Sequence, residues 1–237
     1  NYPANFSLSA AQATSLGLTA GSYVLTGGVP NANPTRANFS QVAVIPAANR
    51  YNFAQTYQRY PAYDYGSAYT SLEHEFSDTM TGFAELMWSN NRTYYAFTPG
   101  VINFSTEGLS LPANSPYNPF GIPLTTLLGR TNFGPVRKFD TESNAASFLG
   151  GLRGTILNRW NWEAAAAYGS GQVTSVARNA VRATTYQAAL NGTLPGFVGS
   201  FFNPFGPSSN PGLQNALFTS STGMNKVESL GYDLRVD

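Results

Sequence analysis

Long runs in which apolar and polar residues alternate predict an all-β protein, and more specifically an antiparallel up-and-down membrane β-barrel segment. We expect about seven long strands, joined by short periplasmic turns at one end and long extracellular loops at the other. The clearest alternation lies at 144–171, where two arms flank a tight turn at Asn158-Arg159. Successive side chains of a strand point to opposite faces. Each arm therefore has one apolar face and one small or polar face, over at least the roughly 9–11 residues that a tilted strand needs to cross a bilayer.

The connections between the expected strands fall into two length classes. Short turns are predicted at 46–49, 77–80 and 158–159, and long loops at 1–38, 98–143 and 174–227. Because the direction of the strands alternates, the short turns all lie at one end of the sheet and the very long loops at the other. This separation is typical of bacterial outer-membrane barrels.

In the first part of the chain, the sequence gives only weak indications of secondary structure. Ser7 or Ser9 could cap a short helix at 10–13, after which frequent Gly and Pro residues break any longer element. Candidate strands follow at 39–45 and 50–57. These two strands are needed to reach a total of about seven.

The strands on either side of the central hairpin are better supported. The runs 65–76 and 81–97 alternate around the turn at 77–80 and predict a second hairpin. The last long loop has room for a short helix near 186–190. The alternation returns at 229–237, which predicts the final strand.

Composition excludes several classes of function. The 237 residues carry 13 Lys plus Arg and 12 Asp plus Glu, a net charge of +1 that gives no indication of nucleic-acid binding. With no Cys and a single His, His74, the chain offers neither a disulfide nor a thiolate metal site, and a Ser-His or multi-His centre is nearly excluded. We expect no cofactor, no metal and no enzymatic activity. Charged residues make up 11% of the chain, against roughly 25% in typical soluble domains.

The charged residues on the strands indicate which face of each strand points toward the lumen. The parity that turns Phe148 and Leu152 toward lipid turns seven charged residues toward the lumen: Glu73, Glu75, Glu85, Arg153, Glu163, Asp233 and Arg235. An Arg on the lipid face at the bilayer midplane would cost roughly 2–4 kcal/mol. His74 is the exception, but it lies near a turn, where the penalty approaches zero.

Four aromatic residues on the strands are candidates for the membrane-interface girdle: Trp88, Trp160, Trp162 and Tyr168. A sugar-stacking platform is the alternative role for the same rings. The girdle interpretation requires that these rings lie near the ends of an apolar band.

A repeated motif and several strand segments carry a resemblance to a known family. Tyr117-Asn118-Pro119-Phe120-Gly121 and Phe202-Asn203-Pro204-Phe205-Gly206 each lie in a long loop before a returning strand. Together with 69–76, the Ser77-Asp78 turn, Phe83-Ala84-Glu85-Leu86 and Gly151-Leu152-Arg153-Gly154, they resemble the barrel of a TonB-dependent receptor. The resemblance is strongest over 50–237.

Several expectations depend on this resemblance. It implies that 1–237 is part of a 22-stranded barrel with a plugged lumen, whose plug domain and C-terminal strands are absent from the chain. It implies a place in the bacterial outer membrane, in contact with outer-membrane lipid, with the receptor's own plug domain and through it with the TonB energy-coupling protein. The implied activity is active uptake of a scarce nutrient: a ferric siderophore, cobalamin, an oligosaccharide or a peptide. Under this interpretation the lumen-facing charges either contact the plug or form a solvated wall.

The aromatic residues of the repeated motif have two interpretations. Tyr117, Phe120, Phe202 and Phe205 could contact a ligand of the receptor, or their rings could pack on the loops that carry them. Pro fixes φ and Asn-Pro favours turns, so the motif also suits a purely structural turn.

Two other classes of function remain open. The first is a secreted or surface β-sandwich binding module, such as an adhesin or a carbohydrate-binding domain. It would seal Phe148, Leu152, Trp162 and Leu234 between two sheets. The second is a hydrolase, because Glu73 and Glu75 lie two residues apart on one strand face and could mimic a glycosidase pair. That pair lacks an enclosing cleft in the barrel interpretation, so catalysis is not expected.

Overall fold

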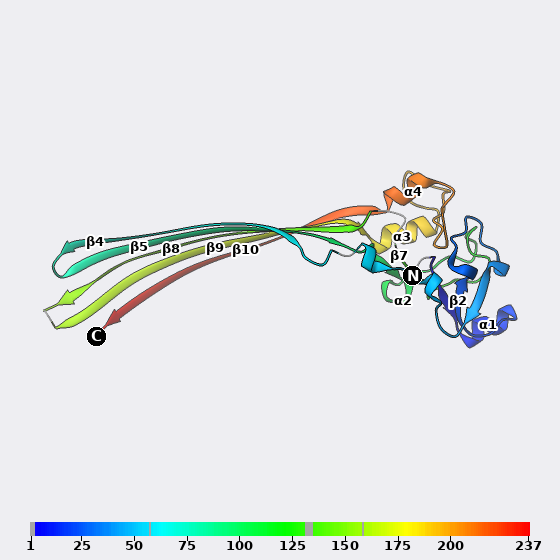
Figure 1. Ribbon diagram of the computed structural model, residues 1–237, viewed down its shortest axis with the longest axis horizontal. Helices are drawn as coiled ribbons and strands as arrows, with labels where there is room; N and C mark the ends of the chain where they lie inside the picture. The colour runs from blue at the N-terminus through cyan, green and yellow to red at the C-terminus, as the bar shows by residue number, and fades with distance from the viewer. Residues whose placement is uncertain (1–2, 57, 131–134, 158) are drawn as a thin grey trace. The chain divides into compact units, whose positions relative to one another are not determined.

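A computed structural model describes residues 3–56, 58–130, 135–157 and 159–237 (Figure 1). The chain divides into two compact units. We call the first the core unit; it comprises Asn1–Gln58, Ala96–Lys138 and Arg178–Ser221. We call the second the sheet unit; it comprises Arg59–Tyr95, Phe139–Ala177 and Thr222–Asp237.

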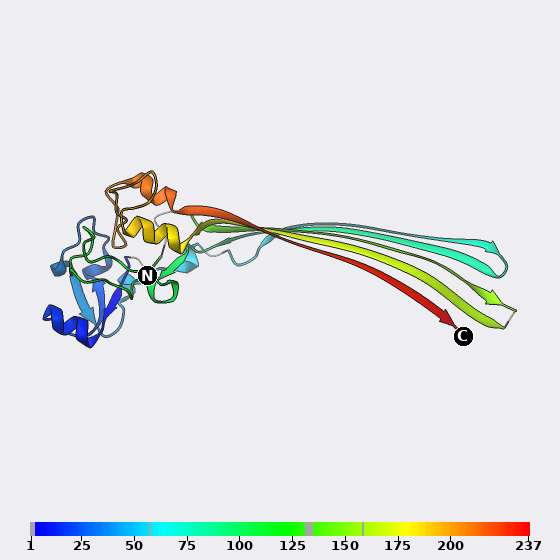
Figure 2. The same ribbon diagram turned by 180° about the vertical axis from the view of Figure 1, so that it is seen from behind.

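Five long strands form one antiparallel sheet. The strands run side by side in both views of the ribbon (Figures 1 and 2). The strands are β4 (Ala62–Ser77), β5 (Met80–Phe97), β8 (Arg137–Ile156), β9 (Trp160–Val181) and β10 (Phe218–Val236). They contain 16, 18, 20, 22 and 19 residues, well beyond the usual 5–6. Within the described chain the order is β10-β9-β8-β5-β4, so the sheet is open, with β10 and β4 at its edges.

The two tight hairpins of this sheet follow the local sequence. The turn predicted at 77–80 joins β4 to β5, and the amide of Thr79 donates to Ser77 Oγ at 3.3 Å. The register of this hairpin shifts between Glu75 and Ser77. β8 and β9 flank the other predicted turn, where the amide of Arg159 donates to the Ile156 carbonyl at 3.1 Å. Asn158 of that turn lies outside the described residues.

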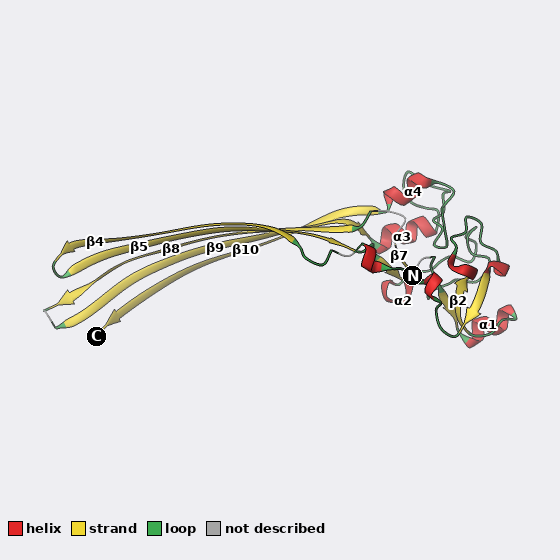
Figure 3. Ribbon diagram, viewed as in Figure 1, coloured by secondary structure: helices red, strands yellow, loops and turns green. Residues whose placement is uncertain are grey.

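The core unit contains the short elements (Figure 3). β1 (Phe6–Leu8), β2 (Gly21–Leu25) and β3 (Phe39–Val42) form an antiparallel sheet, and β6 (Val101–Asn103) pairs with β7 (Leu128–Arg130). The α-helices are α1 (Ala10–Leu16), α2 (Phe104–Glu107), α3 (Ala183–Leu190) and α4 (Pro211–Ala216). Four single turns of 3-10 helix complete the unit: η1 (Thr26–Gly28), η2 (Arg36–Asn38), η3 (Ala47–Asn49) and η4 (Phe53–Gln55).

Two helices confirm the sequence predictions. Ser9 caps α1 through a reciprocal box in which the amide of Gln12 donates to Ser9 Oγ and the amide of Ser9 donates to Gln12 Oε1. The helix then ends at Gly17, whose φ of +65° suits a residue without a Cβ. The helix expected near 186–190 is α3.

The predicted number of long strands is wrong, because the described residues form five long strands rather than about seven. The candidate strand at 39–45 shortens to β3, and the candidate at 50–57 contains η4 instead. Pro46 removes a backbone donor, and the buried Asn49 side chain donates to the Leu25 carbonyl at 2.8 Å, which ties this segment to β2 as a turn. The expected turn at 46–49 is therefore part of the core unit and does not join two long strands.

The predicted long loops are also too long. β8 begins at Arg137, β9 continues to Val181, and β10 begins at Phe218. The remaining loop segments pack around a hydrophobic core to which β1, β2, α3 and α4 all contribute. Among the described residues, no helix has both the length and the apolar character needed to cross a membrane.

Candidate functional site

The register of β4 and β5 sorts their side chains onto two faces. Directly opposed residues of antiparallel strands share a face. Leu72 pairs with Ala84 and His74 with Gly82 on what we call the apolar face. Glu73 pairs with Phe83 and Ser71 with Glu85 on the opposite one, which we call the charged face.

Contacts between side chains extend both faces to β8. Arg153 Nη2 donates to Glu73 Oε1 at 2.6 Å, and its guanidinium lies 5.6 Å from the centre of the Phe83 ring. Arg153 therefore lies on the charged face. Leu152 then lies on the apolar face, where a Cβ on Gly82 would come within 3.3 Å of its Cδ2.

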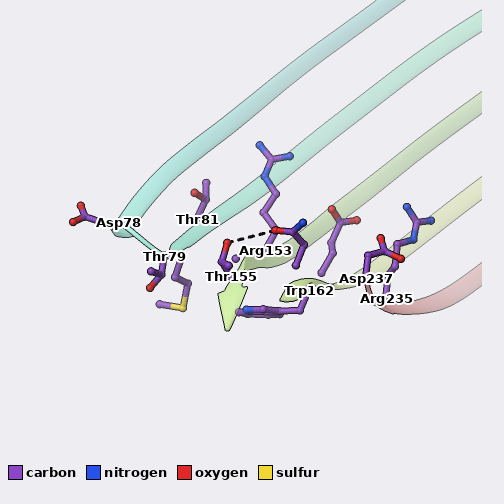
Figure 4. A pocket seen from close by; sticks show the side chains of 12 residues that line it. Asp78, Thr79, Thr81, Arg153, Thr155, Trp162, Arg235 and Asp237 are labelled. Carbon is purple, nitrogen blue, oxygen red and sulfur yellow. Dashed lines mark hydrogen bonds between the residues drawn. The ribbon is translucent and has the colours of Figure 1, made fainter. Parts of the chain in front are cut away.

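The same faces continue across β9 and β10. Thr155 Oγ1 donates to Asn161 Oδ1 at 3.5 Å, and Asn161 exchanges both backbone hydrogen bonds with Asp237 at 2.8 Å. Alternation then puts Trp162 on the apolar face and Arg235 on the charged face. Figure 4 shows this separation, with the Arg153 and Arg235 side chains on one side of the strands and the Trp162 ring on the other.

Large side chains of the apolar face are exposed on several strands. Phe148 is 46% exposed, Leu152 41% and Leu234 76%. None of the described residues of the sheet unit is buried. The sealed two-sheet core that the sandwich alternative requires is therefore not present over these residues.

The apolar band on this face has a defined length. On β8 it runs from Ala146 to Ile156, about 33 Å at roughly 3.3 Å per residue. A strand tilt of about 35–45° would reduce this to a height of about 25 Å, which is the height of the apolar band on outer-membrane barrels. Of the predicted girdle rings, Trp88 and Tyr168 lie at one end of the band, and Trp160 and Trp162 lie at the end nearest the tight turns.

Beyond this band the same face becomes polar on neighbouring strands. Asn90 Nδ2 donates to Asn144 Oδ1 at 2.6 Å, and Arg92 forms an ion pair with Asp140 at 2.6 Å. Glu142 accepts from Asn90 at 3.1 Å. The sequence analysis missed these residues, although the parity of Phe148, continued toward 138, would have identified them.

The charged face brings together five of the seven residues predicted to face the lumen. A depression of about 390 Å³ near the tight turns is lined by Arg153, Glu163 and Arg235. A neighbouring depression of about 280 Å³ is lined by Glu73, Glu85, Arg153 and Glu163. Of the other two, Glu75 is opposite Thr81 on this face, and Asp233 shares the parity of Arg235.

This arrangement suits a solvated wall better than a reaction centre. Glu73, one of the two carboxylates considered for hydrolysis, forms an ion pair with Arg153. The Glu73 side chain is 61% exposed and the Arg153 side chain 46%. In the part of the chain that the structure describes, no group of three or more His, Cys, Asp or Glu side chains is placed to hold a metal ion.

The four loop aromatics lie in the core of the core unit. Tyr117, Phe120, Phe202 and Phe205 are all buried, and Phe205 is fully so. The Phe120 and Phe205 rings both contact the Phe6 ring, with centroids 5.1 and 6.1 Å away. A ligand would reach these rings only if the core opened, so burial favours the packing role over ligand contact.

The repeated motif is a turn organised by its Asn residue. In the first copy, Asn118 Oδ1 accepts from the amide of Phe120 at 3.1 Å, and Nδ2 donates to the carbonyls of Pro112 and Ile122, both at 2.8 Å. The side chain thereby satisfies buried main-chain groups on two segments.

The second copy repeats this arrangement. Asn203 Oδ1 accepts from the amide of Phe205 at 2.9 Å, and Nδ2 donates to the carbonyls of Asn31 at 2.8 Å and Pro207 at 3.1 Å. The sequence analysis identified the repeat and considered both ligand contact and a structural turn, but it did not identify the hydrogen bonds of the Asn side chains. In both copies the Asn side chain fixes the turn, and in the second copy it also joins the loop to the segment at Asn31.

Comparisons with known proteins give no family for this chain. No protein-family model matches the sequence, and no curated protein or solved structure matches it either.

Proposed function

We propose that this chain forms part of the wall of an outer-membrane β-barrel of the TonB-dependent receptor type. In this role the apolar face contacts lipid and the charged face lines a water-filled interior. The receptor would take up a scarce nutrient, such as a ferric siderophore, cobalamin, an oligosaccharide or a peptide, with energy transmitted through a plug domain.

One observation carries this proposal. On five neighbouring strands a band of large apolar side chains lies on one exposed face, and the charged side chains beside the middle of the band lie on the other face. On β10 the band ends at Glu228, which accepts from the Tyr168 hydroxyl and forms an ion pair with Lys226. An apolar surface of this extent in water would drive association. Lipid covers it without a second protein layer, and the aromatic rings at both ends of the band suit the membrane interfaces.

The open edges of the sheet are consistent with a larger wall. Unpaired backbone groups at an edge are not tolerated in the hydrocarbon region of a bilayer. Under this proposal, further strands pair with β4 and β10 to close the barrel.

A matched pair of substitutions on one strand tests the proposal. Leu152→Arg places a cation on the apolar face, whereas Leu149→Arg places it on the charged face three residues away. Leu149 is a better control than Gly151, because a Cβ at Gly151 would approach the Ala164 carbonyl oxygen to 2.5 Å and the Phe83 ring to 2.6 Å.

The two variants are compared in the protein expressed from its complete gene in a Gram-negative host. The readout is the amount of folded, heat-modifiable protein in the outer-membrane fraction. We expect Leu152→Arg to lose about 2–4 kcal/mol of stability and to fall sharply in folded amount, while Leu149→Arg stays near wild type. Equal losses in the two variants would rule out a lipid-facing role for the apolar face.

A further inference from the structure

The two units carry opposite net charges, although the whole chain is nearly neutral. The core unit has one carboxylate, Glu107, and seven cationic residues, so its net charge is +6; the cations are Arg36, Arg50, Arg130, Arg137, Lys138, Arg178 and Arg182. The sheet unit has six cationic and eleven acidic residues, so its net charge is −5. Although the net charge of the whole chain is near zero, the core unit is strongly basic. A basic unit raises the local concentration of anions.

Two arginines of the core unit converge on one residue, Thr98. Arg137 Nε donates to the Thr98 carbonyl at 3.0 Å, and Arg130 Nη1 donates to Thr98 Oγ1 at 3.3 Å and to the Pro99 carbonyl at 3.2 Å. Thr98 is itself buried. Both guanidinium groups are therefore fixed beside the same short segment.

An aromatic ring holds each guanidinium in place. Arg130 lies over the Tyr51 ring, 5.2 Å from its centre, and Arg137 lies over the Phe97 ring at 4.9 Å. The hydrogen bonds use one nitrogen of each group, Nη1 of Arg130 and Nε of Arg137. Among the described residues, Nη1 and Nη2 of Arg137 and Nε and Nη2 of Arg130 make no further hydrogen bond.

No protein carboxylate balances this pair. Every Asp and Glu of the chain lies in the described residues, and none forms an ion pair with Arg130 or Arg137. Partial burial lowers the pKa of Arg137, and the nearby Arg130 charge lowers it further. Two like charges held close together, with planar donor groups that bond none of the described residues, are the arrangement that a bidentate oxyanion neutralises.

We propose that Arg130 and Arg137 form a binding site for a doubly charged oxyanion, of which inorganic phosphate is the simplest example. This site goes beyond the proposed barrel function, because it requires neither a closed barrel nor transport. The anion is held by the free edges of the two guanidinium groups. Its source is either a soluble phosphorylated ligand or a lipid headgroup.

The test measures binding of inorganic phosphate by calorimetry at low ionic strength. It uses the protein expressed from its complete gene and purified in a detergent without phosphate. The double variant Arg130→Gln/Arg137→Gln removes the site. The control, Arg36→Gln/Arg50→Gln, removes two positive charges from the same unit. Arg36 and Arg50 are a matched pair because each donates to a main-chain carbonyl, that of Leu16 or of Ile45.

We expect saturable phosphate binding that weakens at least about tenfold in Arg130→Gln/Arg137→Gln and changes less than about twofold in the control. Absence of saturable binding in the wild type would overturn the proposal. Equal weakening in both double variants would also overturn it, since the effect would then come from net charge alone.

A second variant keeps the test decisive if the double variant does not fold. Arg137→Lys retains the charge but not the planar fork, and we expect it to weaken phosphate binding about tenfold. An unchanged affinity of this variant for phosphate would contradict the proposed binding site.

Short-chain phosphatidic acid is titrated in parallel with phosphate to identify the source of the anion. Tighter binding of the lipid, lost in Arg130→Gln/Arg137→Gln, supports the site with a headgroup as its ligand. Preference for free phosphate, lost in the same variant, supports the site with a soluble ligand. Binding of neither probe to the wild type overturns the proposal.

Discussion

Phenylalanine is used in opposite ways in the two units. In the core unit, Phe6, Phe120 and Phe205 are at most 6% exposed, and the Phe6 ring contacts the other two edge to face. In the sheet unit, Phe76 and Phe148 are 58% and 46% exposed. The core unit buries its rings within the chain, as a water-soluble domain does. The sheet unit leaves its rings exposed.

The polar groups, like the Phe rings, differ in burial between the core unit and the sheet unit. The buried Asn203 side chain of the core unit donates to the main-chain carbonyl of Asn31, far away in the sequence, whereas the Glu73–Arg153 ion pair of the sheet unit lies on an open face with both side chains about half exposed. Under the proposed function, the two units of one sequence are adapted to different solvents. Burial of apolar groups stabilises the core unit, and the separation of apolar and charged faces suits the sheet unit to a lipid–water boundary.

The largest difference between the units is expected for truncation of a ring. Phe205→Ala removes a fully buried ring and leaves a cavity, so we expect a loss of about 3–5 kcal/mol. Phe148→Ala removes a ring from the apolar face, where lipid or detergent fills the space, so we expect only the transfer contribution of about 1.5–3 kcal/mol. Denaturant unfolding in detergent measures both. A larger loss for Phe148→Ala than for Phe205→Ala would reverse the comparison.

Asparagine gives the next largest contrast. Asn203→Ala leaves the Asn31 carbonyl and the Phe205 amide without partners in a buried environment, at a cost of about 2–3 kcal/mol. Asn144→Ala in the sheet unit removes a half-exposed side chain and should cost about 0.5–1 kcal/mol. Thermal unfolding monitored by circular dichroism compares the two variants. Equal decreases in melting temperature would argue that the hydrogen bonds of Asn203 do not stabilise the core unit more than those of Asn144 stabilise the sheet unit.

Glycine tests how tightly each unit is packed. A Cβ at Gly206 would lie 2.3 Å from the Asn31 carbonyl oxygen, so Gly206→Ala should destabilise the protein by about 1–3 kcal/mol. A Cβ at Gly231 on β10 meets no atom within 4 Å, so Gly231→Ala should be neutral or stabilising by about 0.4–1 kcal/mol. The same unfolding measurement applies. Destabilisation at Gly231 would reveal packing against the charged face that the described chain does not provide.

The smallest effect is expected on the charged face. Glu73→Gln removes the ion pair with Arg153, and because both side chains are about half exposed the loss should be about 0.2–1 kcal/mol and should shrink in high salt. Unfolding at low and high salt measures it. A loss above about 3 kcal/mol would mean that the face is dry and that its charges are buried against another layer.

The sequence analysis predicted the faces of the sheet well, because alternation is a local signal with a period of two residues. It missed the first part of β8 because Lys138, Asp140 and Glu142 are polar on the face that later carries Phe148, so this part of the strand has the composition of a loop. It missed the fold of the core unit because contacts such as Phe6 with Phe205 join opposite ends of the chain. The pairing of Arg130 with Arg137 likewise depends on Thr98, which lies far from both in the sequence.

The most direct test of the account is the lipid accessibility of successive positions on β8. The chain contains no Cys, so single Cys substitutions at 147, 148, 149 and 152 can each carry a nitroxide label in the membrane-reconstituted protein. We predict that labels at Phe148 and Leu152 collide mainly with oxygen dissolved in lipid, and that labels at Ser147 and Leu149 collide mainly with a water-soluble nickel complex. Equal accessibility to the water-soluble reagent at all four positions would contradict the assignment of the apolar face to lipid.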